Sequence, residues 1–374
     1  MQVFRMNMNT KPIINVIEID SKDVRYQTGI ERYMNILRDN MPKNIFTFRI
    51  IFYRASDCTS VSIKLSDNEL SIVHPQQFAA QCLYPAIITL LRERLEQMTN
   101  LIVKSNCLGF EGLVYAIRSS IYCKTIGVLH CVPRIMPHMM QPNPLFGMDH
   151  IITVCDSTKP WLSAIRNNRP VSLIHNGIDR PVISKKTADK TDAFRFIFAN
   201  GLAAHKGFAK IIPAIRRVAT QHKIEVFVLG GSDEAGDKLL EANTDLPIKY
   251  VGLLTDDKEI AKYYQMADCA LFASDSEACS FAGIEAMAYN LPIISTNAPG
   301  LYEMFGPNAA LYVAMDANAK INPDEYATQM IRVIDEPKLR RQLSIKGYAR
   351  YLSQYTARQM VSTTVALYNK LITQ

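Results

Sequence analysis

Two acidic residues, Glu277 and Glu285, stand eight positions apart in the stretch SDSEACSFAGIEAMAYNLPIIST, residues 274–296. Small residues separate them, and the apolar run DCALFA just before them is typical of a strand. We therefore expect Glu277 in a loop at the end of this strand and Glu285 about one turn into the following helix. Ligands of open parallel sheets bind at such strand ends, beside the free N–H groups of the next helix.

The spacing of the two acids alone leaves two readings open. Glu277 can be a helix-capping acid and Glu285 a solvated helix residue, which is the commoner case for two acids eight positions apart. The neighbours of Glu285 favour a functional reading, because Ile284 and residues 286–288 are too apolar for a plain solvent face. A carboxylate in such surroundings needs hydrogen-bond donors, and the hydroxyl groups of a ligand can supply them.

The composition is typical of a soluble, globular protein with room for two domains. Of its 374 residues, 48% are hydrophobic and 21% are charged, and no apolar run is long enough to span a bilayer. Its eight cysteines form no C-x-x-C pair and are expected to be buried free thiols. The net charge is +7, but the basic residues are spread along the chain and form no run interleaved with aromatic residues. We therefore expect no nucleic-acid partner. The first residues carry no secretory signal, which favours a cytoplasmic protein and leaves peripheral contact with the inner face of the membrane open.

Short β-rich runs alternate with helix-like segments along the whole chain. Such alternation predicts an α/β fold with parallel sheets covered by helices. The polar, lysine-rich stretch 180–194 reads as a linker between two groups of strands. We therefore predict an N-terminal domain over residues 1–180 and a C-terminal domain over residues 181–354. Two helices are expected from Pro337 to Gln374, and the last of them, at about 355–374, should pack back on the first domain.

The acid pair lies in a stretch that resembles the E-x7-E segment of retaining GT-B glycosyltransferases, EACSFAGIEAMAYNLPIIST. Three other stretches resemble further motifs of this family in the family's order: VSLIHNGID, GLAAHKGFAKIIPAI and IKYVGLLTDDKEIAKYYQMADCALFAS. Together the four matches cover residues 171–305, and similarity in the first 170 residues is weaker. The resemblance implies a GT-B fold, in which two Rossmann-like domains face each other across a cleft, and it identifies the first domain with the acceptor and the second with the nucleotide sugar.

For the site, the resemblance implies a nucleotide-sugar donor that extends from one acid to the other. Glu285 would hold the ribose hydroxyls, and Glu277 would contact hydroxyls of the donor sugar. Lys206 would bind the diphosphate between them, with the help of backbone N–H groups at the helix start. The other residues expected to bind the donor are Gly29, Gly201, Cys279, Ser280, Phe281 and Ala282.

Three positions carry further expectations from the family. His130 ends a strand where family members carry a histidine near the reacting carbon, so we expect a catalytic role, with a structural histidine as the alternative. Gly201 stands where the family has an arginine beside the phosphates, so the site lacks a charge-assisted contact that His205 or an arginine from elsewhere would have to replace. Ser280 likewise replaces a family glycine.

The resulting expectation is a retaining glycosyltransferase, hexosyl or related, that acts in polysaccharide or glycoconjugate biosynthesis. The acceptor can be a glycan, a lipid-linked molecule or a peptide, and the irregular loop 131–148, rich in methionine, is a candidate surface for it. No D-x-D pair occurs, so we expect neither a metal nor another cofactor. Two alternatives stay open: a GT-B enzyme that epimerises or hydrolyses a nucleotide sugar, and an inactive nucleotide-sugar-binding subunit. The nucleotide, the sugar and the oligomeric state also stay open.

Overall fold

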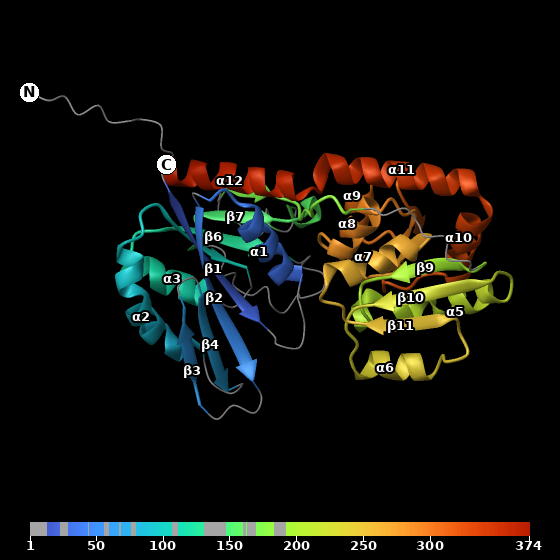
Figure 1. Cartoon of the computed structure of the whole chain (residues 1–374), viewed down its shortest axis with the longest axis horizontal. Coiled ribbons are helices and arrows are strands. Elements are labelled where there is room, and N and C mark those ends of the chain that lie inside the picture. Colours follow the sequence, from blue (N-terminus) through green and yellow to red (C-terminus); the bar gives the residue numbers. More distant parts are fainter. Residues whose placement is uncertain are drawn as a thin grey trace, which may run out of the picture.

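The structure is a computed structural model, and it describes residues 13–22, 29–43, 45–55, 60–66, 69–75, 80–106, 111–130, 147–159, 162, 170–182 and 192–374. These residues form two sheets in separate lobes, and the C-terminal helices run along both (Figure 1). The candidate acceptor loop lies almost wholly outside the described residues. Four of the five described cysteines are buried and all five are free, but Cys82 is exposed, contrary to expectation.

The first sheet has the strand order β3-β4-β2-β1-β5-β6-β7-β8, and only β3 runs antiparallel to its neighbour. Helices α2 and α3 pack on one face, and α1 packs on the other with the C-terminal helix α12 (Ala357–Thr373). Strands β3 and β4 are short and lie between polar residues rather than between helix-like segments, so the alternation of strands and helices along the chain does not predict them. The elements are β1 (Ile14–Lys22), α1 (Gly29–Asn40), β2 (Ile45–Ala55), β3 (Ser62–Leu65), β4 (Glu69–Pro75), α2 (Tyr84–Glu96), β5 (Leu101–Ser105), α3 (Glu111–Ser120), β6 (Lys124–Leu129), β7 (His150–Thr153) and β8 (Val171–Leu173).

The second sheet is wholly parallel and has the order β11-β10-β9-β12-β13-β14. Numbered along the chain, this is the Rossmann order 3-2-1-4-5-6. From β9 the chain adds strands first on one side of the sheet and then, from β12, on the other. Folds of this kind have a crevice at the carboxyl ends of the two strands where the order changes, here β9 and β12. Helices α5 and α10 pack on one face, and α7, α8 and α9 pack on the other. The elements are β9 (Phe194–Phe198), α5 (Phe208–Ala219), β10 (Ile224–Leu229), α6 (Glu234–Glu241), β11 (Ile248–Gly252), α7 (Asp257–Met266), β12 (Cys269–Phe272), α8 (Phe281–Ala288), β13 (Ile293–Thr296), α9 (Pro299–Phe305), β14 (Leu311–Val313) and α10 (Pro323–Asp335).

Two long helices end the chain, α11 (Pro337–Gln354) and α12 (Ala357–Thr373). The first packs on α8 in the second domain, and the second packs on α1 and β1 in the first. Between them Thr356 caps α12 through a reciprocal pair of bonds with Gln359. Gly177 lies against this cap so closely that a Cβ there would come within 2.3 Å of the Thr356 carbonyl oxygen. The two segments at which the chain passes from one domain to the other, after Gly177 and at Thr356, therefore lie against each other.

Candidate active site

Lys206 and Glu277 meet at the crevice of the second sheet. Lys206 follows β9 and Glu277 follows β12, the two strands between which the order reverses. The Lys206 Nζ donates to Glu277 Oε1 over 2.6 Å, and Ser274 Oγ donates to the same oxygen over 3.1 Å. Glu277 is only 8% exposed. The Glu277 carboxylate is therefore held in one position by a cation and a hydroxyl.

A glycine brings these two loops together. Gly207 follows Lys206 at a φ of +78°, in the left-handed region that other residues rarely adopt. A Cβ at this position would lie 2.0 Å from the carbonyl oxygen of Ala273, the residue before the Ser274 loop. Only glycine lets the backbone after β9 pass this close to the end of β12, and the approach places Lys206 within reach of Glu277.

The start of α8 lies beside this pair. Ser280 caps the helix, where its Oγ accepts from the Gly283 N–H over 3.3 Å. The same hydroxyl donates to Asn200 Oδ1 over 3.4 Å, while Asn200 Nδ2 is buried without a hydrogen-bond partner among the described residues. Asn176, from the first domain, donates to the Cys279 carbonyl over 2.7 Å. The sequence analysis gave Asn176 no role, yet it fixes the residue just before the helix tip.

Gly201 and His205 show how the site differs from the family pattern. Gly201 has a φ of +72°, and a Cβ there would lie 2.8 Å from the Gly231 carbonyl oxygen, so this backbone excludes an arginine at position 201. Burial and the neighbouring charge of Lys206 lower the pKa of His205, against the opposing charges of Glu277 and Asp275, which disfavours the imidazolium form that would replace the charge of the arginine.

An arginine of the first domain reaches the second acid. Arg32 Nη1 of α1 lies 2.6 Å from Oε1 of Glu285, which is 5% exposed, and 3.9 Å separate Arg32 from Asp257. The guanidinium also lies over the Phe281 ring, 5.1 Å from its centroid. Burial is the largest single influence on the pKa of Arg32 and lowers it, but the charge and hydrogen bond of Glu285, together with the charge of Asp257, outweigh burial and hold the pKa above its ordinary value. Like Asn176, Arg32 was not among the residues that the sequence analysis predicted for the site. Its only signal was its place three residues after Gly29.

Gly29 lies at the same junction, since an added Cβ would be 3.6 Å from Phe281 Cδ2. The first turns of α1 and α8 thus face each other across the domain interface. Ala282, the last donor-binding residue predicted, accepts at its carbonyl oxygen from the Tyr264 hydroxyl over 3.2 Å. Apart from Gly201 and His130, the structure therefore places the predicted residues around two centres, one at Lys206 and Glu277 and one at Arg32 and Glu285, with the tip of α8 beside both.

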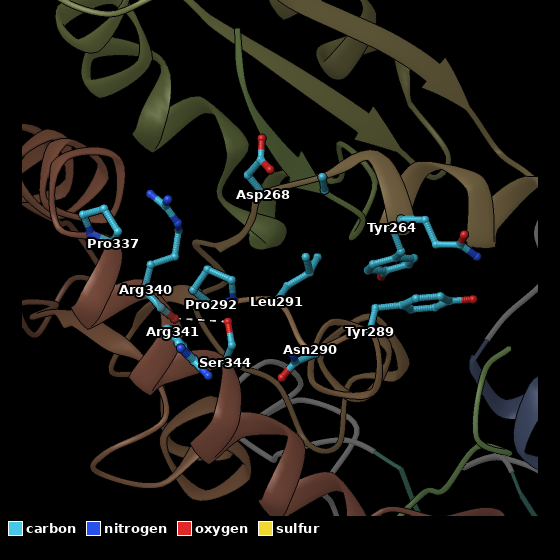
Figure 2. A pocket seen from close by; sticks show the side chains of 12 residues that line it. Tyr264, Asp268, Tyr289, Asn290, Leu291, Pro292, Pro337, Arg340, Arg341 and Ser344 are labelled. Atoms are coloured by element: carbon cyan, nitrogen blue, oxygen red, sulfur yellow. Dashed lines mark hydrogen bonds between the residues drawn. The ribbon is translucent and has the colours of Figure 1, made fainter. Parts of the chain in front are cut away.

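A cavity of about 770 Å³ lies between the domains at the second centre. Arg32 and Glu285 line it together with Tyr289, and its volume is in the range of small-molecule sites. A different cavity, of about 410 Å³, lies at the opposite, amino ends of β12 and β13 (Figure 2). Figure 2 shows the stacked rings of Tyr264 and Tyr289 on one side of it and Arg340 and Arg341 on the other, and none of the predicted site residues lines it.

None of the described contacts of His130 involves a residue of either centre. Its ring packs edge-on against Tyr33 of α1, with 4.7 Å between the centroids, and its Nε2 is buried without a hydrogen-bond partner among the described residues. Burial lowers the pKa of His130 to about 3, and the charge of Lys104 acts in the same direction. The imidazole is therefore neutral over the whole physiological range.

Residues 179–350 match the family model described as "Glycosyl transferases group 1". Over 172 residues the chain is 27% identical to the MMP alpha-(1->4)-mannosyltransferase of Mycolicibacterium hassiacum, a match that covers 45% of the chain and 40% of that enzyme. Across four curated relatives, the matches span between 32% and 62% of the relative's length.

Solved structures are similar over nearly the whole chain. Sucrose-phosphate synthase from Thermosynechococcus elongatus superposes with a TM-score of 0.74 at 17% identity, covering 96% of this chain and 99% of that one. The Anabaena protein HepE, in complex with UDP-glucose, gives a TM-score of 0.74 at 13% identity and covers 96% of this chain and 100% of that one. These likenesses confirm the expected α/β, GT-B fold. None of the described helices is long and apolar enough to cross a membrane.

Proposed function

We propose that this chain, whose residues 179–350 match the family model of the glycosyl transferases group 1, moves a sugar from a nucleotide-diphosphate donor to an acceptor hydroxyl with retention of configuration. The observation that carries the proposal is the hydrogen-bonded pair of Lys206 and Glu277. The pair lies where the strand order of the second sheet reverses, next to the tip of α8. A structural neighbour solved with UDP-glucose supports a nucleotide sugar as the donor class.

The charges around the α8 tip suit a departing diphosphate. Its negative charge rises as the bond to the sugar breaks, so cations and N–H groups aimed at it stabilise the transition state more than the bound donor. Lys206 supplies an ammonium group, and the first turn of α8 supplies N–H groups and the positive end of the helix dipole. The buried Asn200 Nδ2 adds a donor without a described partner at the same place.

The two acids would bind the two ends of the donor. Glu285 at the interdomain cavity would accept hydrogen bonds from the ribose, and Glu277 would accept them from the sugar. We propose a front-face displacement, in which the leaving phosphate oxygen takes the proton of the acceptor hydroxyl on the same face of the sugar. Such a step needs no nucleophile from the protein. Glu277 orients the sugar, and its bond to Lys206 ties that orientation to the position of the phosphate.

A thermal-shift panel of nucleotide sugars, followed by product analysis, tests the proposed function. A donor that binds only the folded state stabilises it by mass action, by about 2.7 kcal/mol at a hundred times its Kd. Transfer to an added hydroxyl acceptor with the α-configuration of an α-donor supports the proposal. Epimerised or free sugar without acceptor would instead indicate the epimerase or hydrolase, and binding without nucleotide release would indicate the inactive subunit.

Arg32 should act through donor affinity. Arg32→Ala is expected to raise the donor Kd about tenfold to a hundredfold, because a hydrogen bond to a charged group contributes about 1.5–3 kcal/mol. The reason is that Arg32 alone brings a first-domain cation to Glu285 and the α8 tip among the described contacts. Calorimetric titration with the donor measures the effect. Arg38→Ala is the control, since Arg38 lies in the same helix and pairs with exposed Asp39. Unchanged affinity in Arg32→Ala would remove Arg32 from the site.

Transfer should proceed without a metal ion. Lys206, Arg32 and the α8 tip provide the positive charge that a D-x-D-bound metal supplies in other transferases, so we expect full turnover in excess EDTA. The measurement is the initial rate with and without chelator after dialysis. A loss of turnover that added Mg²⁺ restores would contradict this prediction.

A further inference from the structure

Helix α9 connects the first domain to the backbone of the acid that the proposed reaction places at the sugar. The start of α9 lies against the loop that carries Glu277. A Cβ added to Gly300 would lie 1.8 Å from the Glu277 carbonyl oxygen and 2.7 Å from that of Ala278. Glycine permits this close approach of two backbones because it has no side chain. A displacement of α9 would therefore also displace Glu277.

The middle of α9 is bonded to the first domain through the side chain of Glu303. Its carboxylate accepts three hydrogen bonds at the start of a short 3-10 helix that follows β7, η5 (Asp156–Thr158). The Asp156 N–H donates to Oε1 over 2.6 Å, and the N–H and hydroxyl of Ser157 donate to Oε2 over 2.8 and 2.7 Å. Both carboxylate oxygens are thus engaged, and hydrogen bonds to an ionised acceptor are about twice as strong as neutral ones.

Each side of this connection is also held by bonds of its own. In the first domain, Thr158 Oγ1 donates to the Cys155 carbonyl oxygen over 2.8 Å, which fixes the turn that presents the donors. In the second domain, Arg350 of α11 donates to the carbonyl oxygens of Glu303 and Met304 over 2.7 and 2.8 Å, which holds the last turn of α9. The bonds of the Glu303 carboxylate therefore join two well-supported parts of the chain.

We propose that Glu303 is a positioning residue, which holds Glu277 at the donor sugar by tying α9 to the first domain. This inference rests on the proposed function. The Asn176 bond to the Cys279 carbonyl holds the same loop from the first domain at a second point. A misplacement of about 1 Å can lower a rate about a hundredfold, so an acid that orients the reacting sugar depends on such support. Docking of the acceptor-side domain thus sets the position of the acid on the donor side.

Thiol labelling tests the interdomain half of the inference without any substrate. Two interface thiols flank the connection, Cys155 just before η5 and Cys279 two residues after Glu277, and both are buried in one apolar cluster shared by the domains. In Glu303→Ala these two are expected to react with N-ethylmaleimide at least about tenfold faster than in the wild type, because the interface opens more often. Peptide mass spectrometry reads the rate for each cysteine. The exposed Cys82 should react equally in both proteins.

Two further cysteines distinguish an opened interface from a loosened fold. Cys123 and Cys269 are buried inside the separate domains and should stay protected in the variant. Interface thiols that stay as protected in Glu303→Ala as in the wild type overturn the inference. Faster labelling of Cys123 and Cys269 as well would show that Glu303 supports the whole fold, and it overturns the inference equally. Ser157→Ala, which removes one of the three bonds, should show a smaller change of the same kind and provides the test if Glu303→Ala does not fold.

Kinetics test the positioning half. Glu303→Ala is expected to lose at least about tenfold in kcat and to keep its donor Kd within about threefold, because Glu277 contacts the reacting sugar rather than the distant ribose. In the Glu277→Ala background the same substitution should lower kcat by less than about threefold, since the acid that Glu303 positions is already absent. Glu234→Gln is the control and should keep the wild-type kcat, because this exposed carboxylate pairs with Lys238 within α6.

The kinetic outcomes separate the inference from the proposed function on which it rests. A wild-type kcat in Glu303→Ala, or a loss that appears in the donor Kd instead, overturns the positioning role. So does an undiminished loss in the Glu277→Ala background, because Glu303 would then act independently of Glu277. If the wild type itself transfers no sugar, the proposed function fails, while thiol labelling still decides whether Glu303 holds the domains together.

Discussion

Replacing Lys206 by methionine is expected to lower kcat by about a hundredfold to a thousandfold. Removing one preorganised donor to developing negative charge costs about 2.7–4 kcal/mol in transition-state stabilisation. Lys206 fits this role because its ammonium group is fixed by Glu277 over 2.6 Å at the strand crossover, beside the tip of α8. The donor KM should change less than kcat, because the charge on the diphosphate increases only as the sugar leaves.

The chain offers a closely matched control for this variant. Lys210 lies four residues on, in α5, and also pairs with an acid of the loop after β12, Asp275, as well as with the Ala319 carbonyl. Lys210→Met removes a positive charge from the same region. Because both known partners of Lys210 are groups of the protein itself, we expect kcat to change less than threefold. Initial rates over a range of donor concentrations give both constants. Equal losses in the two variants would show a general field effect and contradict a specific role for Lys206.

The resemblance to the family placed Lys206 and Glu277 in one site, and the geometry of parallel sheets gives a physical reason why they lie together. Both follow apolar runs that read as strands, and parallel strands present their carboxyl ends at one edge of the sheet. The strand order then places them side by side. Helix α8 could also be predicted, since Ser280 and Asn290, which flank it, are typical helix boundaries; all its apolar residues except the half-buried Phe281 are buried.

Contacts between the domains could not be predicted in this way. The bonds of Arg32 to Glu285 and of Asn176 to Cys279 join residues more than a hundred positions apart, and periodicity within an element says nothing about which surface it meets. A buried ion pair in the first sheet, Lys104 of β5 with Glu18 of β1, was hidden for another reason. Each residue interrupts a buried strand, and only the register of β1 and β5 shows that the two charges face each other.

Variants of the two acids should affect different kinetic constants, because the surroundings of the two acids differ. Glu277 receives both of its described hydrogen bonds on Oε1, from Lys206 and Ser274, so Oε2 is the oxygen available to a sugar hydroxyl. Glu285 lies at the interdomain cavity with Arg32. An acid that contacts the reacting sugar influences the transition state, whereas one that holds the distant ribose contributes to donor and transition state alike.

Glu277→Ala is therefore expected to lower kcat by at least a hundredfold with a small change in donor KM, and Glu285→Ala to raise donor KM with a small change in kcat. In the proposed mechanism the Glu277 variant loses its contact with the sugar, and it also frees Lys206, whose ammonium group is then no longer fixed by a carboxylate. Steady-state rates at saturating acceptor measure both constants, and Glu277→Gln separates the two effects because it retains hydrogen-bonding capacity without the charge. Turnover at the wild-type rate by Glu277→Ala would contradict the assignment, since no other acid among the described residues is bonded to Lys206.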